Sequence, residues 1–175
     1  MGQQSFGREP KGYKINGSRD GDQRRCLCGA VRYTAEADPT SATVCHCRDC
    51  QKFTGSAFAA LVLATKEAVA IEGALKTFSS IGGSGNPILR HFCPECGSSI
   101  AEEPGTRPGT IILNVGTFDD PTVAKPGREI FRRDALTWIE VHGEIPRFAK
   151  TARLKFMNDR LRWYSQTEIY SADEA

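Results

Sequence analysis

The sequence Phe92-Cys-Pro-Glu-Cys-Gly-Ser98 has the form of a zinc knuckle. In such a tight turn two thiolates converge on one metal ion, and the glycine after the second cysteine permits a positive φ. Two thiolates fill only half of a tetrahedral site, so a closed site needs two more ligands from elsewhere. Cys26 and Cys28, which are separated by one residue, are the best donors of these ligands.

A second cluster, Cys45-His-Cys-Arg-Asp-Cys50, has three thiols within six residues. These three thiols are enough to hold a metal ion, whereas Cys26 and Cys28 cannot form a site alone. Four protein ligands mark a structural zinc, and three ligands with a vacant position mark a reactive one. The economical division is therefore a closed zinc site made of Cys26, Cys28, Cys93 and Cys96, and an open zinc site made of Cys45, Cys47 and Cys50.

The number and clustering of the seven cysteines favour metal binding over other uses of thiols. An odd count in a chain without an apolar leader argues against a disulfide framework and for a cytoplasmic protein. The alternative is that the thiols are scattered apolar core residues, which clustering disfavours. The longest apolar run, residues 57–64, is too short to span a membrane, so we expect no membrane partner.

Overall charge indicates no obvious anionic macromolecular partner, because 23 basic and 21 acidic residues leave a net charge of +2. Two zinc ions with seven thiolates would carry about −3, which favours basic neighbours. Candidates for these neighbours are Arg24, Arg25, Arg48, Lys52 and Arg90. The alternative for each is an ordinary solvated surface charge.

An open zinc site is a Lewis acid that favours soft sulfur and lowers the pKa of a bound thiol. We therefore expect a small-molecule thiol as substrate, with transfer of its sulfur to or from a carbon electrophile. His46 and Asp49 lie inside the triad as possible ligands or proton carriers, but a supporting or solvated role is favoured for both. His91 is expected in a half-buried strand, and His142 has no cysteine cluster nearby.

The rest of the chain predicts a mainly β protein with short helical turns. Residues 28–34 alternate as a strand does, and a short helix that opens within the 45–50 cluster should end at Gly55. Turn residues separate further short strands at 58–63, 69–72, 75–79, 88–92, 98–101 and 110–115. Trp138 and Ile139 are expected to cover the sheet. In the C-terminal extension, Leu154, Met157 and Leu161 allow a helix.

Three motifs together resemble the glutathione-dependent formaldehyde-activating family, which includes centromere protein V. They are Cys26-Leu-Cys-Gly-Ala-Val-Arg-Tyr33, Cys45-His-Cys-Arg-Asp-Cys-Gln-Lys-Phe-Thr-Gly-Ser-Ala-Phe58 and Arg90-His-Phe-Cys-Pro-Glu-Cys-Gly-Ser98. Residues 131–148, with Trp138 and Ile145-Pro-Arg-Phe148, are similar to the family's usual ending. The resemblance covers residues 22–148 and leaves a polar arm at 1–21 and an extension at 149–175.

This resemblance implies a zinc-binding β-tent fold built from small antiparallel sheets, with two Zn²⁺ per chain. It implies the same division into a structural and a catalytic cysteine set. It also implies a carbon–sulfur lyase that joins glutathione and formaldehyde reversibly as S-hydroxymethylglutathione. The rival hypothesis is a non-catalytic zinc module that carries a thiol or docks a protein. Nucleic-acid binding is disfavoured because no basic recognition helix is apparent.

Overall fold

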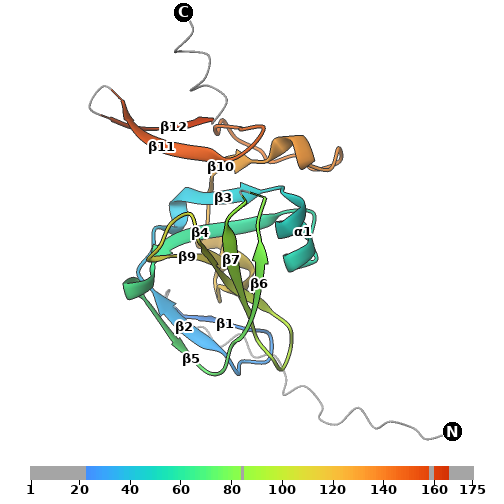
Figure 1. Cartoon of the computed structure of the whole chain (residues 1–175), viewed down its shortest axis with the longest axis vertical. Coiled ribbons are helices and arrows are strands. Elements are labelled where there is room, and N and C mark those ends of the chain that lie inside the picture. The colour runs from blue at the N-terminus through green and yellow to red at the C-terminus, as the bar shows by residue number, and fades with distance from the viewer. Residues whose placement is uncertain (1–22, 84, 158–159, 166–175) are drawn as a thin grey trace, which may run out of the picture.

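The computed structural model describes residues 23–83, 85–157 and 160–165, so the polar arm predicted at 1–21 lies outside it. β-strands are the main regular structure of the described chain, and Figure 1 shows them with α1 on one side. The largest sheet has seven strands, in the order β10 (Pro126–Ile130), β3 (Ala42–Cys45), β4 (Ala59–Thr65), β9 (Thr110–Asn114), β8 (Ser99–Pro104), β7 (Pro87–Phe92) and β6 (Lys76–Ile81).

Two smaller sheets flank this one at opposite ends of the molecule (Figure 1). The first is three-stranded, in the order β1 (Arg24–Arg25), β2 (Arg32–Ala35) and β5 (Val69–Glu72), and the second pairs β11 (Ala152–Met157) with β12 (Arg160–Ser165). The helical elements are α1 (Arg48–Thr54) and five 3-10 turns at Pro39–Ser41, Lys66–Ala68, Val115–Thr117, Pro121–Val123 and Arg132–Asp134. No helix in these described ranges is long and apolar enough to cross a membrane.

The mainly β class with antiparallel sheets and short helical turns is confirmed. The six strands predicted between residues 58 and 115 are present as β4 to β9, within a few residues at each end. Gly55 ends α1 with a φ of 66°, the left-handed conformation that glycine adopts without strain. One pairing differs from the expected pattern, because β10 runs parallel to β3.

The core lies between the seven-stranded sheet and the three-stranded sheet. Val62 of β4 pairs with Leu113 of β9, which pairs with Ala101 of β8, so these three side chains share one face. They belong to the same buried cluster as Tyr33 of β2 and Val31 of the turn before β2. Burial of these apolar side chains supplies the main driving force for the fold.

The other face of the seven-stranded sheet carries a second set of residues. In the next register row, Ile112 of β9 pairs with Glu102 of β8, which pairs with Arg90 of β7. Cys45 at the end of β3 lies on this same face. It pairs with Ala59 of β4, and Ile112 pairs with Leu63 of the same strand. Ala59 and Leu63 are an even number of residues apart, so their side chains point to the same face. This face therefore combines the Cys45 thiol with the buried charges of Arg90 and Glu102.

Three local expectations were wrong. Residues 28–31 form a turn rather than the start of a strand, because the N–H of Cys26 bonds to the carbonyl of Val31 at 3.0 Å. The C-terminal extension forms strands rather than a helix, consistent with the alternation of basic and apolar residues in 152–157 and 160–165. Trp138 does not cover the sheet, since 72% of it is exposed.

Gly73 offers a test of how the core sheet meets the first cysteine turn. It has a φ of +94°, and a Cβ there would lie 2.1 Å from the carbonyl oxygen of Ala30. We expect Gly73→Ala to lower the free energy of unfolding by about 3 kcal/mol or more, through strain and backbone collision. Chemical denaturation of the metal-loaded protein measures this loss.

Gly116→Ala is the matched control, because a Cβ at Gly116 meets no atom within 4 Å and its φ is not positive. This variant should unfold within about 0.5 kcal/mol of the unsubstituted protein. Equal stabilities of the two variants would contradict the close approach of residues 30 and 73.

Candidate metal centres

The first cysteine group joins two turns that are far apart in the sequence. Cys26 and Cys28 flank Leu27 after β1, and Cys93 and Cys96 lie in the turn after β7. The sulfur atoms of Cys26 and Cys28 are 3.5 Å apart, those of Cys28 and Cys93 are 3.8 Å apart, and all four lie within 4.8 Å of one another. Four thiolates around one tetrahedral metal at about 2.3 Å have sulfur–sulfur separations of about 3.8 Å. The four thiols are thus arranged as a closed metal site.

Both turns have the same local construction. A glycine follows the second cysteine of each, Gly29 with a φ of 77° and Gly97 with a φ of 73°. The N–H of each glycine bonds to the carbonyl of the first cysteine of its turn, at 3.1 and 2.9 Å respectively. Ser98 connects the turns, because its Oγ accepts the N–H of Leu27 at 3.0 Å. Backbone hydrogen bonds therefore fix the conformation of both turns, and the Ser98 side chain links one turn to the other.

The second group lies where β3 passes into α1. Cys45 ends β3, Cys47 is the N-cap of α1, and Cys50 is in its first turn. Their sulfur atoms lie within 4.8 Å of one another, and the N–H of Cys50 points to the Cys47 sulfur at 3.4 Å. Cys45 and Cys50 are buried, whereas Cys47 is partly exposed. Within the described part of the chain no fourth ligand atom joins this group.

Electrostatics shows why three such close thiols suit a cation. Hydrogen bonds from the Cys45 and Cys50 thiols lower the pKa of Cys47 to about 3. Hydrogen bonding to Cys47 raises the pKa of Cys45, and hydrogen bonding to both neighbours raises the pKa of Cys50. One thiol ionises easily while the other two resist, because three thiolates at this spacing repel one another. A divalent, thiophilic metal ion removes that conflict, so the residues present fit a metal site.

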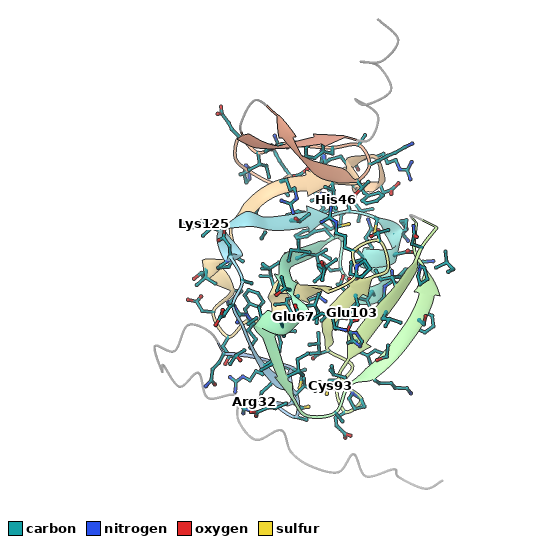
Figure 2. The ribbon with its side chains drawn as sticks, turned by 60° about the vertical axis from the view of Figure 1, so that its left-hand side comes forward. Arg32, His46, Glu67, Cys93, Glu103 and Lys125 are labelled. Atoms are coloured by element: carbon teal, nitrogen blue, oxygen red, sulfur yellow. The ribbon has the colours of Figure 1, made fainter. Side chains whose placement is uncertain are left out.

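These are the two groups that cysteine spacing predicts, and their separate structural and catalytic roles stay a prediction. Figure 2 labels Cys93 of the first group and His46, the neighbour of Cys45 and Cys47, in opposite halves of the molecule. The first group connects the turn at 26–28 to the turn at 93–96, whereas the second forms a single local segment. Each group therefore depends on different contacts of the fold.

His46 points away from the thiols beside it. It is fully buried and lies on the opposite side of the strand from Cys45, where its Nε2 is 3.7 Å from Oε2 of the fully buried Glu129. Burial lowers the pKa of His46. His46 is therefore neither solvated nor in the ligand group, and it contributes to the contact between β3 and β10. His91 is half-buried in β7 as expected, and His142 is exposed.

Glu129 is a charged residue in this region that the sequence did not reveal. Its Oε2 lies 3.0 Å from Nε of Arg132 and 3.8 Å from Nε of Arg147. Because the carboxylate is fully buried, these two guanidinium groups compensate its charge where water cannot. Glu129 thereby ties the end of β10 to the segments that follow it.

Arg90 is one of the five basic residues expected near the cysteine clusters, and it holds α1 against the sheet. Its guanidinium group donates to Ser80 Oγ at 2.6 Å and lies 3.5 Å from Asp49 and 3.6 Å from Glu102. It also lies over the ring of Phe53, 5.8 Å from the centroid. Asp49 and Phe53 both belong to the helix that supplies Cys50, so Arg90 connects the second metal group to β6, β7 and β8.

Glu102 is the second buried acid that the sequence did not single out. Burial raises the pKa of its carboxyl group to about 7, and the charge of Arg90 opposes this rise. No local motif marks Glu102, because its burial follows from the register that pairs it with Arg90. Its position gives the face under α1 a titratable carboxyl group near neutral pH.

The other expected cations lie in different surroundings. Arg24 donates to the carbonyl of Ala35 at 3.2 Å, and Arg25 pairs with Asp119 at 2.9 Å. Arg48 and Lys52 are exposed on α1, where they line a hollow of about 250 Å³ together with Leu136 and Trp138. A larger cleft of about 770 Å³ lies at the C-terminal end of α1, and its lining includes Lys52.

Two comparisons with known proteins found matches to this chain. A family model described as glutathione-dependent formaldehyde-activating enzyme matches residues 22–134, more than half of the chain. The crystal structure of a Rhodobacter sphaeroides protein is similar at 21% identity with a TM-score of 0.47, and the match covers 71% of this chain and 98% of that one. No curated protein matches the chain closely enough to count as a relative.

Arg90 provides a test of the second group that uses the first as an internal reference. Removing its contacts should loosen α1, so we expect Arg90→Met to weaken metal binding at Cys45, Cys47 and Cys50 about 10-fold or more. Binding at the four-cysteine group should not change. Competition with a coloured chelator on metal-loaded protein resolves the two ions as a weak and a strong fraction.

Arg25→Met is the control, because Arg25 forms an exposed ion pair with Asp119 next to the first group. Such pairs contribute little, so both metal affinities should stay unchanged. Equal weakening of both ions in Arg90→Met would indicate general destabilisation and contradict a local role for Arg90.

Proposed function

The chain belongs to the glutathione-dependent formaldehyde-activating enzyme family, and from this premise we propose that it is a zinc-dependent carbon–sulfur lyase. Its reaction is the formation or breakdown of S-hydroxymethylglutathione from glutathione and formaldehyde. The observation that carries this proposal is the group of three thiols in which Cys47 is partly exposed and no fourth protein ligand is present among the described residues.

The two cysteine groups are proposed to hold two zinc ions with different roles. A closed set of four thiolates suits a structural ion, and three thiolates leave a position for substrate. The structural set is Cys26, Cys28, Cys93 and Cys96, and the catalytic set is Cys45, Cys47 and Cys50. When bound to the catalytic set, zinc supplies an open position that accepts a thiol sulfur and lowers its pKa.

The chemistry asks little more of the protein than binding and charge compensation. In the forward direction, the glutathione sulfur forms a bond to the formaldehyde carbon while the carbonyl π electrons move to oxygen. The proton lost by the thiol is balanced by the proton gained by the new hydroxyl group, so no oxidant or reductant takes part. Arg90, buried beneath α1, offsets the negative charge that accumulates around the three thiolates.

The exposed face of α1 suits the carboxylates of glutathione. Lys52 has no ion-pair partner within the described residues, and it lines both the 250 Å³ hollow and the 770 Å³ cleft. Arg48 lies one helical turn away and follows the ligand Cys47 directly. Because both cations lie on the helix that carries Cys50, they favour a thiol that carries carboxylates over a neutral thiol.

The expected location is the cytoplasm. All seven cysteines are free thiols in the structure, and both proposed zinc sites need them reduced. Glutathione as the partner thiol is also consistent with a reducing compartment. The proposed partners are therefore glutathione and an aldehyde, with no nucleic acid and no membrane.

The direct test is exchange spectroscopy by NMR with isotopically labelled formaldehyde and glutathione, which measures formation and breakdown of the adduct against the uncatalysed background. We expect the metal-loaded protein to accelerate both directions. Cys47→Ser should remove this acceleration, because it withdraws one ligand of the open site.

The same variant separates the enzyme from a non-catalytic zinc module. The four-cysteine site of Cys47→Ser should retain its metal, which shows that the fold is intact. No excess rate from unsubstituted protein that carries both ions would reject the lyase reaction and favour the module.

A further inference from the structure

Phe131 has an unusual backbone conformation at the end of β10. Its φ of 56° and ψ of 38° place it in the left-handed region, and no other non-glycine residue in the described chain has a positive φ. For a bulky side chain this conformation costs about 1–2 kcal/mol. A strained residue of this kind persists only when its surroundings hold it in place.

Backbone hydrogen bonds fix this conformation from several directions. The N–H of Phe131 donates to the carbonyl of Lys150 at 2.8 Å, and its own carbonyl accepts the N–H of Asp134 at 2.9 Å. The next residue, Arg132, donates its N–H to Phe148 at 3.0 Å and pairs with buried Glu129. The segment is therefore anchored on both sides of the strained residue.

The left-handed turn changes the direction of the Phe131 side chain. Ile130 pairs with Cys45 in the parallel ladder and packs against the buried cluster of Cys45, Cys50, Ala59 and Leu61. In a continuing strand the next side chain would point to the opposite face. Phe131 nevertheless packs against the same cluster as Ile130, and the partly exposed Cys47 packs against this cluster too. The strain thus brings an aromatic ring onto the side of the sheet that holds the three thiols.

We infer that Phe131 is a specificity-determining residue whose ring walls the open metal site and limits the electrophile to the smallest aldehydes. Formaldehyde carries only hydrogen atoms on its carbonyl carbon, so it fits beside the ring. A longer aldehyde has an alkyl group that must occupy the space of the ring. The proposed selectivity rests on the lyase reaction proposed above. The proposed position of the ring over the site does not depend on that reaction.

Two substitutions separate the ring from the strain. Phe131→Gly removes both, because glycine adopts a positive φ freely, and Phe131→Ala removes the ring but keeps the strain. In both variants the rate with propionaldehyde relative to formaldehyde, each with glutathione, should rise about 10-fold or more. Phe78→Ala is the control, because Phe78 is a ring on the edge strand β6 that is 58% exposed, and its ratio should not change.

A second measurement needs no turnover. Extraction of metal by a bulky chelator should be several-fold faster from the second site in both Phe131 variants, with the four-cysteine site unchanged as a reference for folding. Phe131→Leu, which keeps an apolar side chain, should give an intermediate rate of extraction. This variant provides the test if the glycine and alanine variants fold poorly.

The outcomes are distinguishable. Unchanged extraction would overturn the position of the ring, and faster extraction with an unchanged aldehyde ratio would overturn its selectivity. If the unsubstituted protein shows no lyase activity, the proposed function fails, and extraction still decides whether the ring covers the site.

Discussion

Repulsion between crowded thiolates is the constraint on which this structure depends. Each cysteine group places its sulfur atoms within 4.8 Å of one another, too close for all of them to ionise without a cation. The fold resolves this conflict differently at the two sites. One group surrounds its centre with four sulfur atoms from two turns, and the other offers three sulfur atoms and one partly exposed edge. The difference between a closed and an open metal site follows from the number of thiols that the backbone delivers.

The second site depends on polar and charged groups buried on both faces of the sheet. Arg90 and Glu102 lie beneath α1, while His46 and Glu129 lie on the opposite side, where Glu129 binds Arg132 and Arg147. Both sets converge on the short segment from the end of β3 to the first turn of α1. Buried ion pairs of this kind contribute little net stability but fix one arrangement of the chain around the three thiols. The strained Phe131 follows from the same packing, since Glu129 and Arg132 flank it.

The sequence predicts the parts of this structure that are set by local pattern. Turn residues delimit β4 to β9, and the spacing of the cysteines gives the three-thiol group and the two halves of the four-thiol group, because ligands within one turn are brought together locally. The need of a closed site for four ligands then joins the two halves. Strands β3 and β10 were missed, since β3 runs directly into the cysteine cluster and β10 begins with Pro126 and Gly127 and contains charges that strands disfavour. Their parallel pairing, the burial of Glu102 and Glu129, and the left-handed Phe131 depend on contacts between distant segments, which no local pattern encodes.

The most direct test of the two-site account is X-ray absorption at the zinc edge on protein that carries both ions. One closed and one open site predict a mean of about 3.5 sulfur neighbours per zinc at about 2.3 Å, with lighter atoms completing the shell. Added glutathione should raise the mean to about four sulfur neighbours. Four sulfur neighbours per zinc before any thiol is added, or no change after it, would contradict an open site built from Cys45, Cys47 and Cys50.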